Sequence, residues 1–104
     1  MKISKQQTLV IISAALLSLT TACATRPVDN HARNLAASCA ACHGTNGKSV
    51  GGAPVLAGLD KSYFITQMKD MKSGTRPTTV MSKHAKGYSD EEIAQLAEYF
   101  AAQK

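Results

Sequence analysis

Two cysteines and a histidine near the middle of the chain have the spacing of a cofactor attachment site. Cys39, Cys42 and His43 form the run Cys-Ala-Ala-Cys-His. The cysteines lie about one helical turn apart, so their thiols can add to both vinyl groups on one edge of a porphyrin. The adjacent His43 can then give an imidazole nitrogen to the iron. The pattern is the attachment motif of haem c and predicts one covalently bound haem.

The Cys-x-x-Cys pair has three alternative uses: a thioredoxin-type redox couple, half of a zinc site, and a structural disulfide. A zinc site calls for a second Cys/His pair, and no cysteine follows Cys42. A thioredoxin-type couple occurs in a β-α-β pattern, and the sequence shows none. The haem interpretation is therefore favoured.

The ligand on the other side of the iron decides between electron transfer and an open, reactive site. Met81 is the predicted second axial ligand, because it lies in a stretch expected to be irregular (75–88), just ahead of a well-capped helix. A loop in that place can fold over the haem and bring a thioether to the iron. His84 is the rival ligand, since imidazole also binds haem iron well. Three other candidates are not expected to bind the iron, because Met68 and Met71 are assigned to the core and His31 to the surface.

Three segments have the caps and apolar spacing of helices, and no strand pattern is evident. The stretches between them, 44–58 and 75–88, are rich in turn residues or lack periodicity, so they are expected to wrap the porphyrin as loops. The fold prediction is therefore all-α, with three to four helices around one haem. The helices run from Asp29 or Asn30 through Leu35 to the cysteines, from a cap at Asp60 or Ser62 to Ser73, and onward from a capping box of Ser89 and Glu92.

The N-terminus has the pattern of an export signal. Lys2 and Lys5 precede an apolar run over 9–19, which is too short for a membrane span and is followed by small residues. Residues 1–24 are therefore predicted to be a signal peptide and 25–104 a single domain. Export to the periplasm also agrees with covalent haem attachment, which bacteria carry out outside the cytoplasmic membrane.

Two kinds of cleavage fit the end of this signal. Ala22-Cys23-Ala24 satisfies the small-x-small rule of an ordinary signal peptidase, which would discard Cys23. The run 19–23 also resembles a lipobox, in which Cys23 becomes the lipid-bearing first residue and tethers the protein to a membrane. The charge of the chain is modest, +5 in total, and its lysines are interspersed with acids, so nucleic acid is not an expected partner.

The order of these features resembles that of the class I cytochromes c. A capped helix, the Cys-x-x-Cys-His motif, a glycine/proline loop, a helix, a methionine stretch and a terminal helix follow one another over 25–104. The resemblance implies that the carbonyl of Pro54 contacts the imidazole of His43. It also implies that the first and last helices cross, with Tyr99 or Phe100 at the contact. The implied function is single-electron transfer by one haem c, with redox proteins as partners.

A narrower resemblance concerns the segments 42–51, 71–81 and 85–93, which are similar to the cytochrome subunits of flavocytochrome c sulfide dehydrogenases. In that family a flavoprotein subunit with FAD oxidises sulfide and passes electrons to the cytochrome. The resemblance implies such a donor here. Two alternatives stay open: a free periplasmic shuttle to a terminal oxidase or another dehydrogenase, and a haem enzyme or gas sensor with an open distal site.

Overall fold

The computed structural model describes residues 30–104, and within that range the regular elements are all helices joined by loops, with no strand. The predicted all-α fold is confirmed. The predicted signal peptide, Cys23 and the cap at Asp29 lie outside the described residues. The elements are α2 (Asn30–Ala37), α3 (Ala40–His43), the 3₁₀ turn η1 (Thr45–Gly47), α4 (Lys61–Ser73), α5 (Met81–Lys86) and α6 (Asp90–Ala101).

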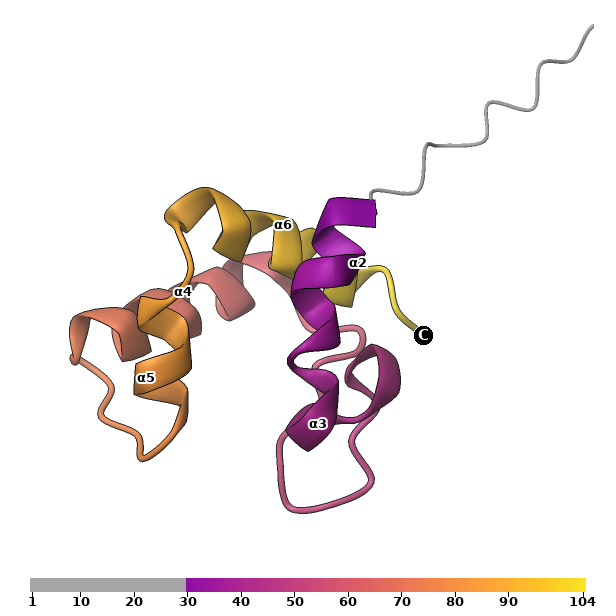
Figure 1. Ribbon diagram of the computed structural model, residues 1–104, viewed down its shortest axis with the longest axis horizontal. Helices are drawn as coiled ribbons and strands as arrows, with labels where there is room; N and C mark the ends of the chain where they lie inside the picture. Colours follow the sequence, from indigo (N-terminus) through magenta and orange to yellow (C-terminus); the bar gives the residue numbers. More distant parts are fainter. Residues whose placement is uncertain (1–29) are drawn as a thin grey trace, which may run out of the picture.

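The helices form two limbs joined by α6 (Figure 1). We call 30–57, with α2, α3 and η1, the cysteine limb, and 61–86, with α4 and α5, the methionine limb. Within each limb neighbouring helices contact each other, and α6 contacts α2 of one limb and α4 of the other. The last helix is therefore the element on which both limbs pack.

The core lies where the limbs meet α6. Phe100, Ile93 and Leu96 of α6 are its largest fully buried side chains. The ring of Phe100 lies 5.7 Å, centre to centre, from the ring of Phe64 in α4. The spacing of apolar residues in α4 and α6 predicts this core correctly, because one face of each helix is buried at intervals of three and four residues. The buried apolar residues are Ala32, Ala36, Phe64, Met68, Met71, Ala85, Ile93, Leu96, Ala97 and Phe100.

The first predicted helix is broken in two. Regular α-helix stops at Ala37 and resumes at Ala40, although Cys39 keeps right-handed helical angles. The amide of Cys39 donates to the carbonyl of Ala36 (3.1 Å), which is a tighter turn than an α-helix makes. Ser38 adds a side-chain bond to the carbonyl of Leu35 (3.1 Å). A serine hydroxyl that bonds to a nearby backbone carbonyl competes with the regular hydrogen bonds of a helix, and here it lies at the break.

The expectation that 75–88 is irregular is wrong over its second half, where α5 forms from Met81 to Lys86. Thr78 and Ser82 hold the start of this helix through reciprocal bonds, with the Ser82 amide donating to the Thr78 hydroxyl (2.7 Å) and the Thr78 amide to the Ser82 hydroxyl (3.1 Å). Ala85 is fully buried and packs in the core. Tertiary packing therefore stabilises a helix too short to form alone.

The predicted caps of the other two helices are confirmed. Asp60 caps α4 by accepting from the amide of Tyr63 (2.9 Å), and Gly74 ends the helix in the left-handed conformation. Ser89 and Glu92 form the capping box of α6, with reciprocal bonds of 3.1 and 2.9 Å. Among the described residues no helix combines the length and the hydropathy of a membrane span.

Candidate haem-attachment site

The two cysteines lie on one tight turn at the lower end of the cysteine limb. The amides of Cys42 and His43 both donate to the carbonyl of Cys39, at 3.3 and 2.8 Å. Cys39 is half-buried, Cys42 is exposed, and both are free thiols. Burial raises the pKa of the Cys39 thiol. Both sulfurs therefore stand on one turn, as attachment to a single porphyrin edge requires.

His43 is buried, with 7% of its surface exposed, and its ring is held in one orientation. Nδ1 of the ring lies 2.7 Å from the carbonyl oxygen of Pro54. A carbonyl only accepts hydrogen bonds, so Nδ1 must carry the proton and donate it. Nε2 then keeps its lone pair, which is the form of imidazole that binds a metal. The contact is the one that the resemblance implies for Pro54.

The loop that carries Pro54 is fixed at its end by Gly47. The carbonyl of Gly47 accepts from the amides of Leu56 (2.8 Å) and Ala57 (3.1 Å), and this closes 48–55 into a compact loop. Gly47 has a positive φ of 75°, and a Cβ at this position would lie 2.8 Å from both the Leu56 side chain and the Phe100 ring. Only glycine fits there, so Gly47 sets the path that brings Pro54 to His43.

The crossing of the first and last helices has the implied aromatic residues. Helix α2 contacts α6, and Ala36 and Phe100 belong to one core cluster. The hydroxyl of Tyr99 donates to the side-chain oxygen of Asn46 (2.8 Å), which sits at a positive φ of 55° in η1. Phe100 thus packs at the core, and Tyr99 ties the edge of α6 to the turn after the attachment motif.

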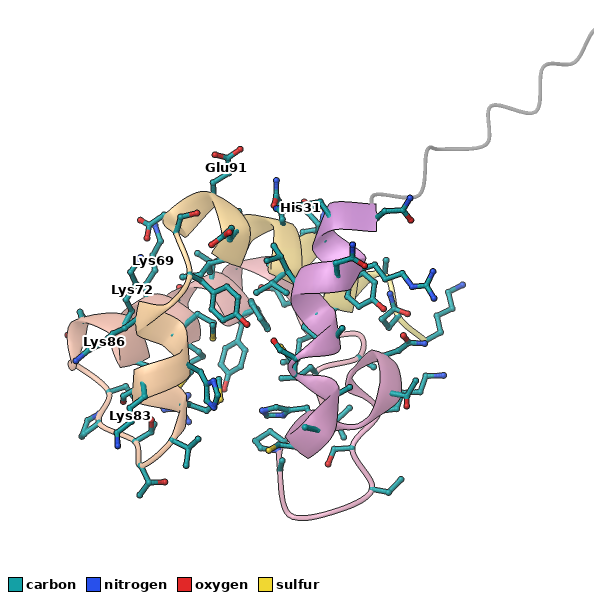
Figure 2. All side chains as sticks on the ribbon, in the orientation of Figure 1. His31, Lys69, Lys72, Lys83, Lys86 and Glu91 are labelled. Carbon is teal, nitrogen blue, oxygen red and sulfur yellow. The ribbon has the colours of Figure 1, made fainter. Side chains whose placement is uncertain are left out.

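Met81 begins α5, on the other limb from His43. Its side chain is half-buried and packs against the same core cluster as Cys39. His84 is exposed in the last turn of α5, and His31 is exposed at the end of α2 that lies away from α3 (Figure 2). Met68 and Met71 are buried, as their place on the apolar face of α4 predicts.

These side chains fit a haem c. The observation that tests the fit is the buried His43, whose Nδ1–H donates to a backbone carbonyl while Nε2 keeps its lone pair. Two free thiols lie on the preceding turn and a thioether, Met81, lies on the other limb, and thiols, imidazole and thioether are the kinds of donor that hold haem c. Cys39, Cys42 and His43 would hold the group from one limb, and Met81 from the other.

Comparison with known proteins agrees with this chemistry, which is that of a c-type cytochrome. Residues 26–100 match the protein family described as cytochrome c oxidase, cbb3-type, subunit III. The chain is 46% identical to the cytochrome subunit of sulfide dehydrogenase from Chlorobaculum tepidum over 74% of its own length and 71% of that protein. It is 38% identical to cytochrome c-553 of Helicobacter pylori over 67% of its length and 75% of that protein.

A further relative is cytochrome c4 of Pseudomonas aeruginosa, which is 43% identical over 66% of this chain but only 35% of the longer protein. The chain thus spans about a third of that relative. Since the family match covers most of the sequence, the chain belongs to this cytochrome c family. It is accordingly a small cytochrome that binds haem c covalently and transfers electrons to and from redox partners.

The sequence pattern misses several contacts that shape the site. The ties of Ser38 to Tyr88 and of Asn46 to Tyr99 join residues about fifty positions apart, and no local pattern signals such pairs. Gly47 was within reach of prediction, because glycine in a turn between two helices often marks a positive φ.

Proposed function

We propose that this cytochrome carries single electrons through a six-coordinate haem iron held by His43 and Met81. Cys39 and Cys42 form the thioether bonds, and Pro54 orients His43 through its carbonyl. The observation that supports this proposal best is the 2.7 Å contact between Nδ1 of His43 and the carbonyl of Pro54. Haem c supplies an iron that cycles between its ferric and ferrous states. A thioether ligand favours the ferrous state, and two protein ligands leave no open site for substrate.

Replacement of Met81 tests the second ligand. In Met81→Ala we expect the ferric protein to lose the weak far-red absorption band of methionine ligation, to become high-spin and to bind carbon monoxide when reduced. His84→Ala is the matched control, because His84 lies one turn away on the same helix but is exposed. Loss of low-spin character in His84→Ala with an unchanged spectrum in Met81→Ala would assign the ligand to His84.

We further propose that the electron donor is the FAD-containing flavoprotein subunit of a sulfide dehydrogenase. The support is the 46% identity to a protein named as the cytochrome subunit of such an enzyme, over nearly three quarters of this chain. The capping box at the start of α6 lies within 85–93, one of the segments that are similar to such cytochrome subunits. A free shuttle serving a terminal oxidase or another dehydrogenase is the competing function.

Reduction by sulfide distinguishes these functions. The ferric cytochrome would be mixed with sulfide alone and with sulfide plus the purified flavoprotein subunit from the same organism, while its visible spectrum is followed. Fast reduction only in the presence of the flavoprotein supports the proposal. Equal rates with and without it, combined with no binding between the two proteins, would contradict this donor and favour a free shuttle.

The site of action that we propose is the periplasm. The signal-like pattern of residues 1–24 supports export, and Cys23 offers a lipid tether. The mass of the mature protein separates the two kinds of cleavage. A mass that corresponds to an N-terminus at Cys23 with attached acyl groups indicates a lipoprotein, and an unmodified N-terminus at Thr25 indicates a protein released by ordinary signal peptidase.

A further inference from the structure

The two limbs must keep a fixed separation if they are to hold one iron between them. His43 belongs to the cysteine limb and Met81 to the methionine limb, and both limbs pack on α6 (Figure 1). At the far end of α6, the hydroxyl of Tyr99 reaches Asn46 of the cysteine limb, after the attachment motif, and the carbonyl of Phe100 accepts from the amide of Gly58. A tie closer to Cys39 and to α5 would restrain the opening between the limbs more directly.

Tyr88 makes such a tie. Its hydroxyl lies 2.8 Å from the hydroxyl of Ser38, the residue before Cys39. Ser38 has a single hydroxyl proton, which it donates to the carbonyl of Leu35 (3.1 Å). Tyr88 must therefore be the donor in the bond between the two hydroxyls. The bond can be removed from either side by deleting one hydroxyl, in Tyr88→Phe or in Ser38→Ala.

The backbone of Tyr88 is fixed to the methionine limb. Its amide donates to the carbonyl of Ala85 in α5 (3.3 Å), and its carbonyl accepts from the ammonium of Lys72 in α4 (2.7 Å). Lys72 is itself held by Asp90 at the start of α6 (3.2 Å), and Figure 2 shows Lys72 between α4 and α6. One residue thus joins α4, α5 and the turn before Cys39.

We propose that Tyr88 is a positioning residue, which sets the separation of the limbs and so determines how firmly Met81 is held on the iron. The inference rests on the proposed axial ligands, His43 and Met81. Without the Tyr88–Ser38 bond, α5 can move away from the cysteine limb while the helices themselves stay folded. An external ligand would then compete more successfully with Met81.

The experiment measures the affinity of imidazole for the ferric holoprotein. Loss of the far-red band reports the replacement of Met81 by imidazole. In Tyr88→Phe and in Ser38→Ala we expect imidazole to bind about fivefold more tightly, which corresponds to the loss of one ordinary hydrogen bond. The double variant should bind it no more tightly than the single variants, because the same bond is removed. Tyr63→Phe is the control, since Tyr63 is an exposed tyrosine on the surface of α4.

The urea unfolding midpoint of each variant completes the test. Midpoints that fall while imidazole affinity stays at the level of Tyr63→Phe would mean that Tyr88 only supports the fold, and this would overturn the proposal. Additive effects of the two substitutions would also overturn it. Failure of the ligand assignment itself is detected separately, because the far-red band would then be absent from the wild-type protein or would survive in Met81→Ala.

Discussion

At the residue scale, the orientation of His43 depends on a backbone atom. The acceptor of its Nδ1 proton is the carbonyl of Pro54, so a changed side chain at position 54 would leave the acceptor in the chain. What matters is the path of the loop, and that path is closed by the carbonyl of Gly47. The orientation of His43 is therefore expected to be sensitive to substitution at Gly47, although no contact described above joins the two residues.

Gly47→Ala should destabilise the protein by about 2–4 kcal/mol, from the cost of a left-handed alanine together with overpacking against Leu56 and Phe100. Gly74→Ala is the matched control: its φ is also positive, at 88°, but a Cβ there meets no atom within 4 Å. Urea unfolding of the ferric proteins measures both. Equal losses in the two variants would show that close packing at Gly47 contributes nothing.

At the element scale, local signals predict α4 and α6 well and α5 poorly. Asp60 and the Ser89–Glu92 box are read directly from the sequence, because a cap acts within three or four residues. Helix α5 has six residues, and its N-cap Val80 has no capping side chain. It is helical because Ala85 is buried and because Thr78 pairs with Ser82. The burial of Ala85 depends on the rest of the fold, so it cannot be predicted from the sequence of this segment alone.

The capping box of α6 can be tested with two neighbouring acids. Glu92→Ala removes the bond to the Ser89 amide and a negative charge at the helix start, whereas Glu91→Ala removes only a charge. Glu91 points into solvent at the start of α6 (Figure 2). We expect Glu92→Ala to cost about 0.5–1 kcal/mol more in thermal unfolding experiments. Identical melting temperatures would exclude a stabilising role for the box.

The junction of α4 and α6 predicts a dependence on pH. Hydrogen bonds from Lys69 and Lys72, reinforced by their charges, lower the pKa of Asp90 below its usual value. A carboxyl with a lowered pKa in the folded state stabilises the protein above its unfolded pKa, and this contribution is lost as the pH falls through the folded value. Urea midpoints measured from neutral pH to about pH 3 should therefore fall less steeply in Asp90→Asn than in wild type. Parallel curves would contradict the linkage.

At the scale of the whole molecule, the core is small for a structure with two limbs. Ten apolar residues are buried in the described part, and four of them are alanines. The sequence predicts which face of each helix is buried, but it does not show that the limbs diverge from α6 or that Tyr88 bridges them. Those features depend on contacts between distant residues, such as Ser38 with Tyr88.

A core of this size leads to a prediction about the cofactor. Cys39→Ser/Cys42→Ser, which cannot form thioethers, should lack a cooperative thermal transition when prepared without haem, because short chains need a cross-link or cofactor to complete a stable core. Far-ultraviolet circular dichroism measures the transition, with the wild-type holoprotein as reference. A sharp transition in the haem-free variant would show that the polypeptide core is sufficient.

Helix α6 comes after both limbs in chain order, yet each limb packs on it. Phe100 near the end of the chain contacts Phe64 in one limb, and its carbonyl accepts from the amide of Gly58 (2.9 Å). We therefore expect the core to be completed only after α6 has been synthesised, with the attachment cysteines still on a segment that is not yet packed. Under the export to the periplasm that we propose, such a delay would keep the chain unfolded while it crosses the membrane and leave its thiols open for haem attachment.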